Sequence, residues 1–152
     1  MEIVVNEWLL DYMRPDSKDS DKIKTFKKFV NAWVKKCDKI VIRRKSPFTS
    51  KFYRHMKQFG WNPDFKECSK RLLDLLFYNS DKTIIVEEAD IKKLPKEIEE
   101  KTPLDDKYLI ELAYSSRDKI IVTTDQRLKE KLHDDVDLKI YLLDEFLGEY
   151  LS

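Results

Sequence analysis

The sequence has little glycine, little cysteine and no long apolar run. Two glycines among 152 residues exclude collagen-like chains and glycine-rich phosphate-binding loops. The two cysteines, Cys37 and Cys68, have no CxxC spacing and no histidine cluster beside them, which argues against a zinc scaffold or a disulfide scaffold. No apolar stretch approaches the roughly 18 residues of a membrane-spanning helix. We therefore expect the fold to depend on an apolar core.

The composition is typical of one globular domain. Apolar residues make up 41% of the chain and aromatic residues 12%, which is enough for a sizeable core, so we expect a single domain over residues 1–152. The segment from Met1 to Asn6 has the pattern of a strand. It lacks the charged region, the apolar region and the small-residue cleavage site that follow one another in a secretory signal. We therefore expect a cytoplasmic protein with no membrane segment.

Short runs rich in valine and isoleucine alternate with longer segments of helical spacing. Most of the short runs are almost continuously apolar, which is typical of strands that are covered on both faces of a parallel sheet. The five predicted strands are Glu2 to Asn6, Lys39 to Arg43, Thr83 to Glu87, Lys119 to Thr123, and Leu138 to Leu142.

The longer segments predict the helices of the two outer layers. Proline or serine marks several helix starts, and in the helix after Pro103 the spacing of Leu104, Tyr108 and Leu112 predicts one buried stripe. Alternating strands and helices indicate an α/β sandwich with right-handed crossovers. The predicted helices are Trp8 to Met13, Asp21 to Lys36, Thr49 to Gln58, Phe65 to Tyr78, Leu104 to Arg117, Asp125 to His133, and Asp144 to Leu151.

The nearly neutral chain hides a basic middle. Between Lys35 and Arg71 there are 12 Lys plus Arg and three acids, although the whole chain has a net charge of only +1. In one interpretation the cations bind phosphates and the aromatic residues between them stack on bases. In the other, the aromatic residues belong to the core and the lysines form a solvated face. The candidate RNA contacts are Arg43, Arg44, Lys45, Lys51, Arg54 and Trp61.

Acids follow several predicted strands or open the helices near them. Asn6 and Glu7 close the first strand, Asp125 follows the fourth, and Asp106 with Asp105 lies in the first turn after Pro103. Functional groups of parallel sheets gather at the carboxyl edge, so we expect an acidic pocket there. Two structural alternatives stay open: Asp106 could complement a helix dipole, and Asp125 could be the N-cap of the following helix.

A cluster of carboxylates repels itself at neutral pH unless a cation neutralises it. Oxygen ligands favour Mg²⁺ or Mn²⁺, and such ions activate water for phosphodiester hydrolysis. An all-carboxylate site beside a basic surface therefore favours a nuclease.

The residues at these strand ends resemble the PIN domain family. The resemblance rests on Ile3 to Leu10, on Asp106 to Ala113, and on Ile120 to Leu128, where a strand ends in Thr, any residue, Asp. Together with the order of strands, it extends over essentially the whole chain. It implies a three-layer α/β/α fold around a parallel five-stranded sheet and a Mg²⁺- or Mn²⁺-dependent ribonuclease.

By position, the resemblance implies that Asp106 and Asp125 bind the metal and that Thr123 supports the turn presenting Asp125. Asn6 stands where the family has its first metal-binding aspartate, and an amide supplies no negative charge. Glu7 could compensate only if it faced the pocket, whereas strand alternation predicts that it points away from Asn6. The family's second acid has no counterpart, since the segment Thr49 to His55 is basic.

These departures leave three functional hypotheses. The first is a PIN-like ribonuclease with catalytic residues Asn6, Glu7, Asp106 and Asp125 and with RNA as substrate. The second is a degenerate domain that binds RNA or a protein without cleavage. The third is the toxin of a toxin-antitoxin pair, with a small antitoxin as partner. A homodimer is also consistent with the resemblance.

Overall fold

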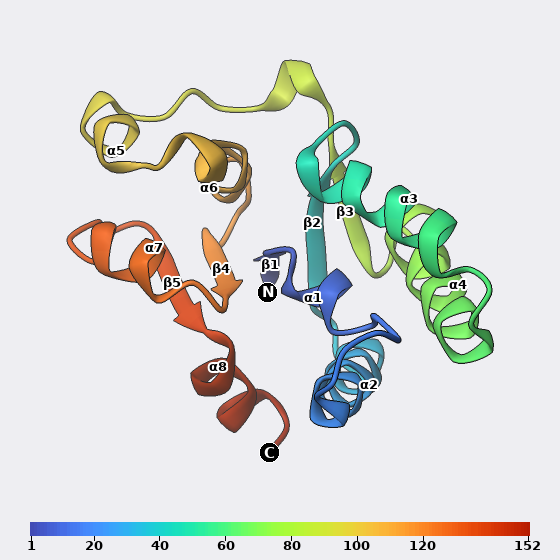
Figure 1. Ribbon diagram of the computed structural model, residues 1–152. Coiled ribbons are helices and arrows are strands. Elements are labelled where there is room, and N and C mark those ends of the chain that lie inside the picture. The colour runs from blue at the N-terminus through green and yellow to red at the C-terminus, as the bar shows by residue number, and fades with distance from the viewer.

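A parallel five-stranded sheet forms the centre of the computed structural model, which describes all 152 residues (Figure 1). Its order is β3-β2-β1-β4-β5, and every neighbouring pair is parallel. This confirms the predicted α/β class and is consistent with a PIN-like fold. The strands are β1 (Glu2–Val5), β2 (Lys39–Arg43), β3 (Thr83–Val86), β4 (Ile120–Thr123) and β5 (Lys139–Leu142).

Both faces of the sheet are buried at β1, β2 and β4, as the continuous apolar runs predicted, whereas the edge strand β5 is partly exposed. Side chains alternate along a strand, so Ile3 and Val5 join a core of 23 buried residues while Val4 joins a second core of 13 on the other face. The strands β2 and β4 divide their residues between the two cores in the same way. The chain therefore has one apolar layer on each side of the sheet.

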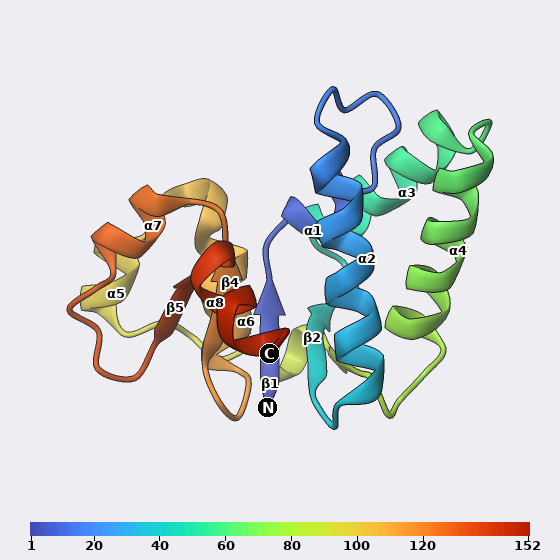
Figure 2. The same ribbon diagram turned by 90° about the horizontal axis from the view of Figure 1, so that it is seen from below.

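Helices cover the two faces unequally, as Figures 1 and 2 show. Together they make the outer layers of a three-layer sandwich, and none of them is long and apolar enough to cross a membrane. The larger core is covered by α1 (Trp8–Asp11), α2 (Ser20–Lys35), α3 (Pro47–Phe59), α4 (Pro63–Phe77) and α8 (Leu143–Tyr150). The smaller core is covered by α5 (Lys96–Lys101), α6 (Lys107–Tyr114) and α7 (Gln126–Lys131).

One predicted helix is interrupted where it matters for the site. The segment expected to be helical from Leu104 to Arg117 begins as a 3-10 turn, Leu104–Asp106, and α6 runs only from Lys107 to Tyr114. The tighter turn changes the direction in which the Leu104 side chain points relative to α6. Leu104 is therefore 85% exposed, whereas the sequence predicted it in the buried stripe. The short helix α5 and the 3-10 turn Glu88–Asp90 were not predicted, because neither is long enough to show a period.

Two helix starts that bear on the site were marked by proline, as predicted. Pro47 opens α3 after Ser46, whose side chain accepts a hydrogen bond from the Thr49 amide. Pro63 opens α4 after Asn62, whose side chain accepts from the Phe65 amide. These caps satisfy amides that a helix leaves without partners, and they fix where α3 leaves the carboxyl edge of the sheet.

Candidate functional site

The candidate site lies at the carboxyl edge of the sheet between β1 and β4. The strand order reverses there, since the chain moves from β1 towards β2 and β3 and later returns to β4 on the other side of β1. Ligands of open parallel sheets bind at such switch points. Asn6 follows β1 and Asp125 follows β4, so both stand at this position.

The side chain of Thr123 ties the ends of the two strands together. Its Oγ1 accepts a hydrogen bond of 3.0 Å from Asn6 Nδ2 and another of 3.0 Å from the Asp125 amide. The residue is completely buried. Thr123 therefore holds the turn that presents Asp125, which is the role that the family resemblance implied.

The Asn6 amide is already engaged within the protein. Its Oδ1 accepts a hydrogen bond of 2.7 Å from the Glu7 amide, while its Nδ2 donates to Thr123. Because the Glu7 N–H needs an acceptor, these two contacts fix which end of the amide faces which neighbour. A metal ion could therefore use only the remaining lone pair of Oδ1, because the amide nitrogen is a donor.

Glu7 faces the pocket, contrary to the expectation from strand alternation. The strand ends at Val5, and Glu7 has φ −64° and ψ −8°, so its side chain follows the helical geometry of α1. The next residue, Trp8, donates a hydrogen bond of 3.0 Å from Nε1 to the Val122 carbonyl. This contact fixes α1 against β4 and holds Glu7 beside the site.

A pocket of about 520 Å³ opens at this point. Its wall is made by the residues after β1, by the first turn of α3 and by the 3-10 turn before α6. Leu104, which the sequence placed in the core, is an exposed apolar part of that wall. The lining residues are Asn6, Glu7, Pro47, Leu104, Asp105, Asp106 and Tyr108.

Electrostatic repulsion concentrates on Asp106. Burial raises the pKa of its carboxyl, neighbouring carboxylates raise that pKa further, and Lys131 opposes them. The pKa of the Tyr108 hydroxyl is likewise raised, by burial first and then by nearby carboxylates. The acids that act on Asp106 are Asp125, Asp105 and Glu7. Asp105 and Glu7 line the pocket together with Asp106, whereas Asp125 is not part of the lining.

Asp125 serves as a helix cap as well. Its Oδ1 accepts a hydrogen bond of 3.2 Å from the Leu128 amide at the start of α7, which confirms the N-cap interpretation. Its second carboxylate oxygen makes no hydrogen bond within the chain. The cap orients the carboxylate, so the structural role and a ligand role are compatible.

The carboxylates suit a metal ion only when further ligands come from elsewhere. No three His, Cys, Asp or Glu side chains are grouped so that they could hold an ion by themselves. Mg²⁺ is commonly held by one or two carboxylates, with water and substrate phosphates completing its shell. Asp106 and Asp125 fit that pattern, and Asn6 can offer one neutral oxygen.

Half of the predicted RNA contacts have partners inside the protein. The Arg43 guanidinium forms a bidentate pair with Glu88, and Arg44 Nε lies 3.4 Å from the Glu87 carboxylate. Lys51 Nζ lies 2.9 Å from Asp11 and 3.8 Å from Glu7. Lys45 and Arg54 are exposed without an ion pair, and Trp61 is 73% exposed.

A second polar cluster beside the site was not predicted. The buried His55 ring has its Nε2 4.0 Å from Asp11 Oδ1, and burial lowers the pKa of this histidine. Asp11 Oδ1 and His55 Nδ1 have no hydrogen-bond partner. The signal that could have revealed Asp11 is its position four residues after Glu7, one helical turn away.

Tyr108 was predicted as a core residue, yet it also lines the pocket. Its position two residues after Asp106 would have indicated this only if the 3-10 turn had been foreseen. Comparison of this chain with protein-family models, with curated proteins and with solved structures finds no match.

Proposed function

We propose that this protein is a PIN-like, Mg²⁺- or Mn²⁺-dependent endoribonuclease that hydrolyses phosphodiester bonds at the carboxylate pocket. The observation that carries the proposal is that Glu7 and Asp106 line one pocket at the switch point between β1 and β4, with Asp125 near enough to act on the Asp106 carboxyl. Burial first and then the neighbouring carboxylates raise the pKa of Asp106, so the fold holds this group where its ionised form is disfavoured. Such an arrangement is typical of functional sites.

The chemistry of the donor set supports phosphodiester hydrolysis. Asp106 and Asp125 would hold the ion, and Asn6 would add a weaker neutral ligand. When bound, a divalent ion at such a site activates water and offsets charge on the phosphate. The two protein carboxylates leave most ligand positions to water and substrate, so metal binding and RNA binding should support each other.

Two pocket residues have roles that need no metal. The raised pKa of Tyr108 keeps its hydroxyl protonated at neutral pH, so it can donate a hydrogen bond to a phosphate oxygen. Glu7 lies on the pocket wall and can accept a hydrogen bond from a water that lies in the pocket. Both side chains therefore orient the reactants.

The test is Mn²⁺-dependent cleavage of a labelled RNA pool by the native chain, by Asn6→Asp, and by Asp106→Asn combined with Asp125→Asn. We expect cleavage by the native chain and at least about 100-fold less by the double variant, because a metal ion contributes several kcal/mol of transition-state stabilisation. The variant Asn6→Asp should cleave faster, since it adds a charged ligand.

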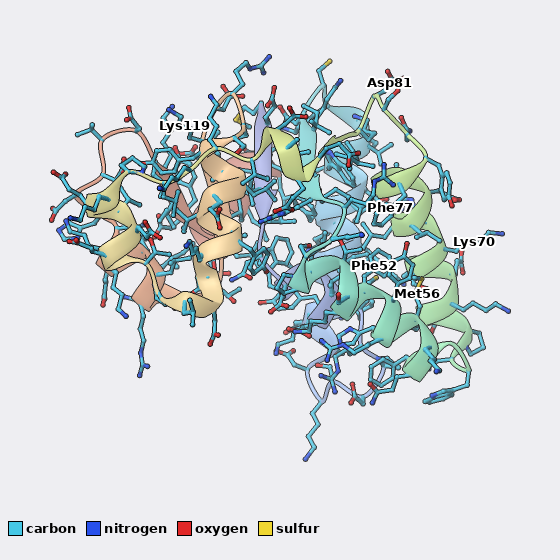
Figure 3. All side chains as sticks on the ribbon, turned by 90° about the horizontal axis from the view of Figure 1, so that it is seen from above. Phe52, Met56, Lys70, Phe77, Asp81 and Lys119 are labelled. Carbon is cyan, nitrogen blue, oxygen red and sulfur yellow. The ribbon has the colours of Figure 1, made fainter.

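A matched control is Asp81→Asn, which removes an exposed carboxylate in the loop before β3, at the opposite edge of the sheet (Figure 3). It should cleave as the native chain does. If neither the native chain nor Asn6→Asp cleaves any RNA with Mn²⁺, the proposed activity is wrong.

A specific observation favours a second candidate, a degenerate PIN-like domain that binds RNA or a protein without cleavage. Both ends of the Asn6 side chain already make a hydrogen bond within the chain. Lys51, whose ammonium lies 3.8 Å from Glu7, belongs to the basic segment where the family's second acid has no counterpart. Such a domain would bind RNA equally well in EDTA and in Mn²⁺. Binding that requires the metal would contradict this candidate.

A further inference from the structure

The helix α3 presents one face that contains cations and aromatic side chains and no acid. Tyr53, Arg54 and Lys57 are exposed on it, while Phe52 and the other large apolar side chains face the core. Positions three and four residues apart lie on the same side of a helix. Trp61 stands four residues after Lys57, and Gly60 between them keeps right-handed helical angles, so Trp61 continues this face.

The positive charge of this face is not neutralised within the chain. Arg54 and Lys57 take part in none of the ion pairs, in contrast to Arg43 and Lys51 nearby. No Asp or Glu occurs in α3. An anionic ligand would therefore meet two free cations here.

The aromatic members of the face are placed for stacking. Tyr53 is 51% exposed, and its ring is backed by Phe77 at 6.2 Å between centroids. Phe52 lies 6.4 Å from Phe77 between ring centroids, and Figure 3 shows Phe52 on the side of α3 that packs towards α4. Trp61 is the only exposed tryptophan, since the other two are buried.

The helix that carries this face begins at the carboxylate pocket. Pro47, the first residue of α3, lines the pocket, and Trp61 lies beyond the other end of the helix. Thirteen helical residues span about 20 Å at about 1.5 Å per residue. At about 3.4 Å per stacked nucleotide, this corresponds to about six nucleotides of one strand.

We propose that the exposed face of α3, formed by Tyr53, Arg54, Lys57 and Trp61, binds a single strand of RNA leading out of the carboxylate pocket. The two cations contact phosphates, and the two aromatic rings stack on bases. A duplex fits this face poorly because its bases are already stacked on one another. This proposal rests on the proposed function in one respect, the position at which the bound RNA is cut.

Binding is measured in EDTA, so that cleavage plays no part, by fluorescence anisotropy of labelled single-stranded RNAs of about 4, 8 and 12 nucleotides. We expect tight binding only for the longer two. Trp61→Ala should weaken binding about tenfold, as loss of a stacking contact does. Arg54→Gln with Lys57→Gln should lower the slope of log affinity against log salt by about 1.4.

Two matched controls separate this face from surface charge in general. Lys96→Gln with Lys101→Gln removes two exposed cations from α5 on the other side of the sheet, and Tyr78→Ala removes an exposed ring after α4. Neither should change the affinity for RNA. Equal losses in the controls and the α3 variants would overturn the proposal, and so would equal affinity for duplex RNA.

Tryptophan fluorescence gives an independent readout. Because Trp8 and Trp33 are buried, RNA should quench the emission of Trp61 alone, and the quenching should vanish in Trp61→Phe. Quenching that persists in that variant contradicts the stacking contact. The double variant at Asp106 and Asp125 should still bind RNA, so loss of cleavage with retained binding tests the pocket and the α3 face separately.

Discussion

At the carboxyl edge of the sheet, the ends of β2 and β3 carry paired charges, whereas the ends of β1 and β4 carry charges of one sign. Arg43 and Arg44 after β2 meet Glu88 and Glu87 after β3. At the switch point, by contrast, burial raises the pKa of Asp106 and neighbouring carboxylates raise it further. Pairing stabilises the first region, while the second keeps electrostatic repulsion that a bound cation would relieve.

The difference teaches how one sheet edge can combine rigidity with a binding site. The ion pairs connect β2 to β3, which is the outermost strand on that side of the sheet. The carboxylate pocket lies next to these ion pairs. Lys51 lies beside the pocket, and its ammonium neighbours Glu7 and Asp11. The following predictions test the contrast.

The largest effect on stability is expected at the paired end. Glu88→Gln removes the partner of the Arg43 guanidinium, whose side chain is only 15% exposed, and leaves that charge without compensation. We expect a loss of about 1 kcal/mol and a fall in Tm of about 3 °C, measured by thermal denaturation at pH 7. Arg44 and Glu87 are both more exposed, so Glu87→Gln should change Tm by less than about 1 °C.

At the pocket, removing a charge is expected to raise the stability of the fold and not to lower it. The pKa of Asp106 is higher in the folded state, so this group contributes stability at pH values below its unfolded pKa, and that contribution is lost as pH rises through its folded pKa. At pH 7, Asp106→Asn therefore removes a destabilising charge, and we expect Tm to rise by about 2 °C. The gain should shrink as pH falls below the folded pKa of Asp106 and disappear below its unfolded pKa. A variant that is less stable at pH 7 would contradict the repulsion inferred for this site.

A smaller effect than at Asp106 is expected when Asn6→Asp adds one more carboxylate to the pocket. In Asn6→Asp the Thr123 hydroxyl can rotate to donate to the new oxygen, so the hydrogen bond between the strand ends is retained. We expect Tm to fall by about 1 °C in EDTA and to rise when Mn²⁺ is added, because binding to the folded state stabilises it. If Mn²⁺ raises Tm equally in the variant and in the native chain, residue 6 does not contact the metal.

The fold was predicted largely from local pattern. The apolar runs from Ile40 to Ile42 and from Ile120 to Val122 are too continuous for a sheet with one wet face, and both strands are buried on both faces. The region before Asp106 was predicted less well. A 3-10 turn there has the same composition as a helix start, and the register shift that exposes Leu104 follows from how the chain approaches the sheet.

The sequence by itself determined the class of the fold and the position of its acids, because the period of apolar residues and the ends of strands are local properties. The tertiary structure decided which charges are free. Arg43 and Glu88 lie 45 positions apart in the sequence with no signal of their pairing, which exists only because β2 and β3 are neighbours. In the same way, the end of β1 at Val5 turned Glu7 towards Asp106, since helical geometry replaces strand alternation there.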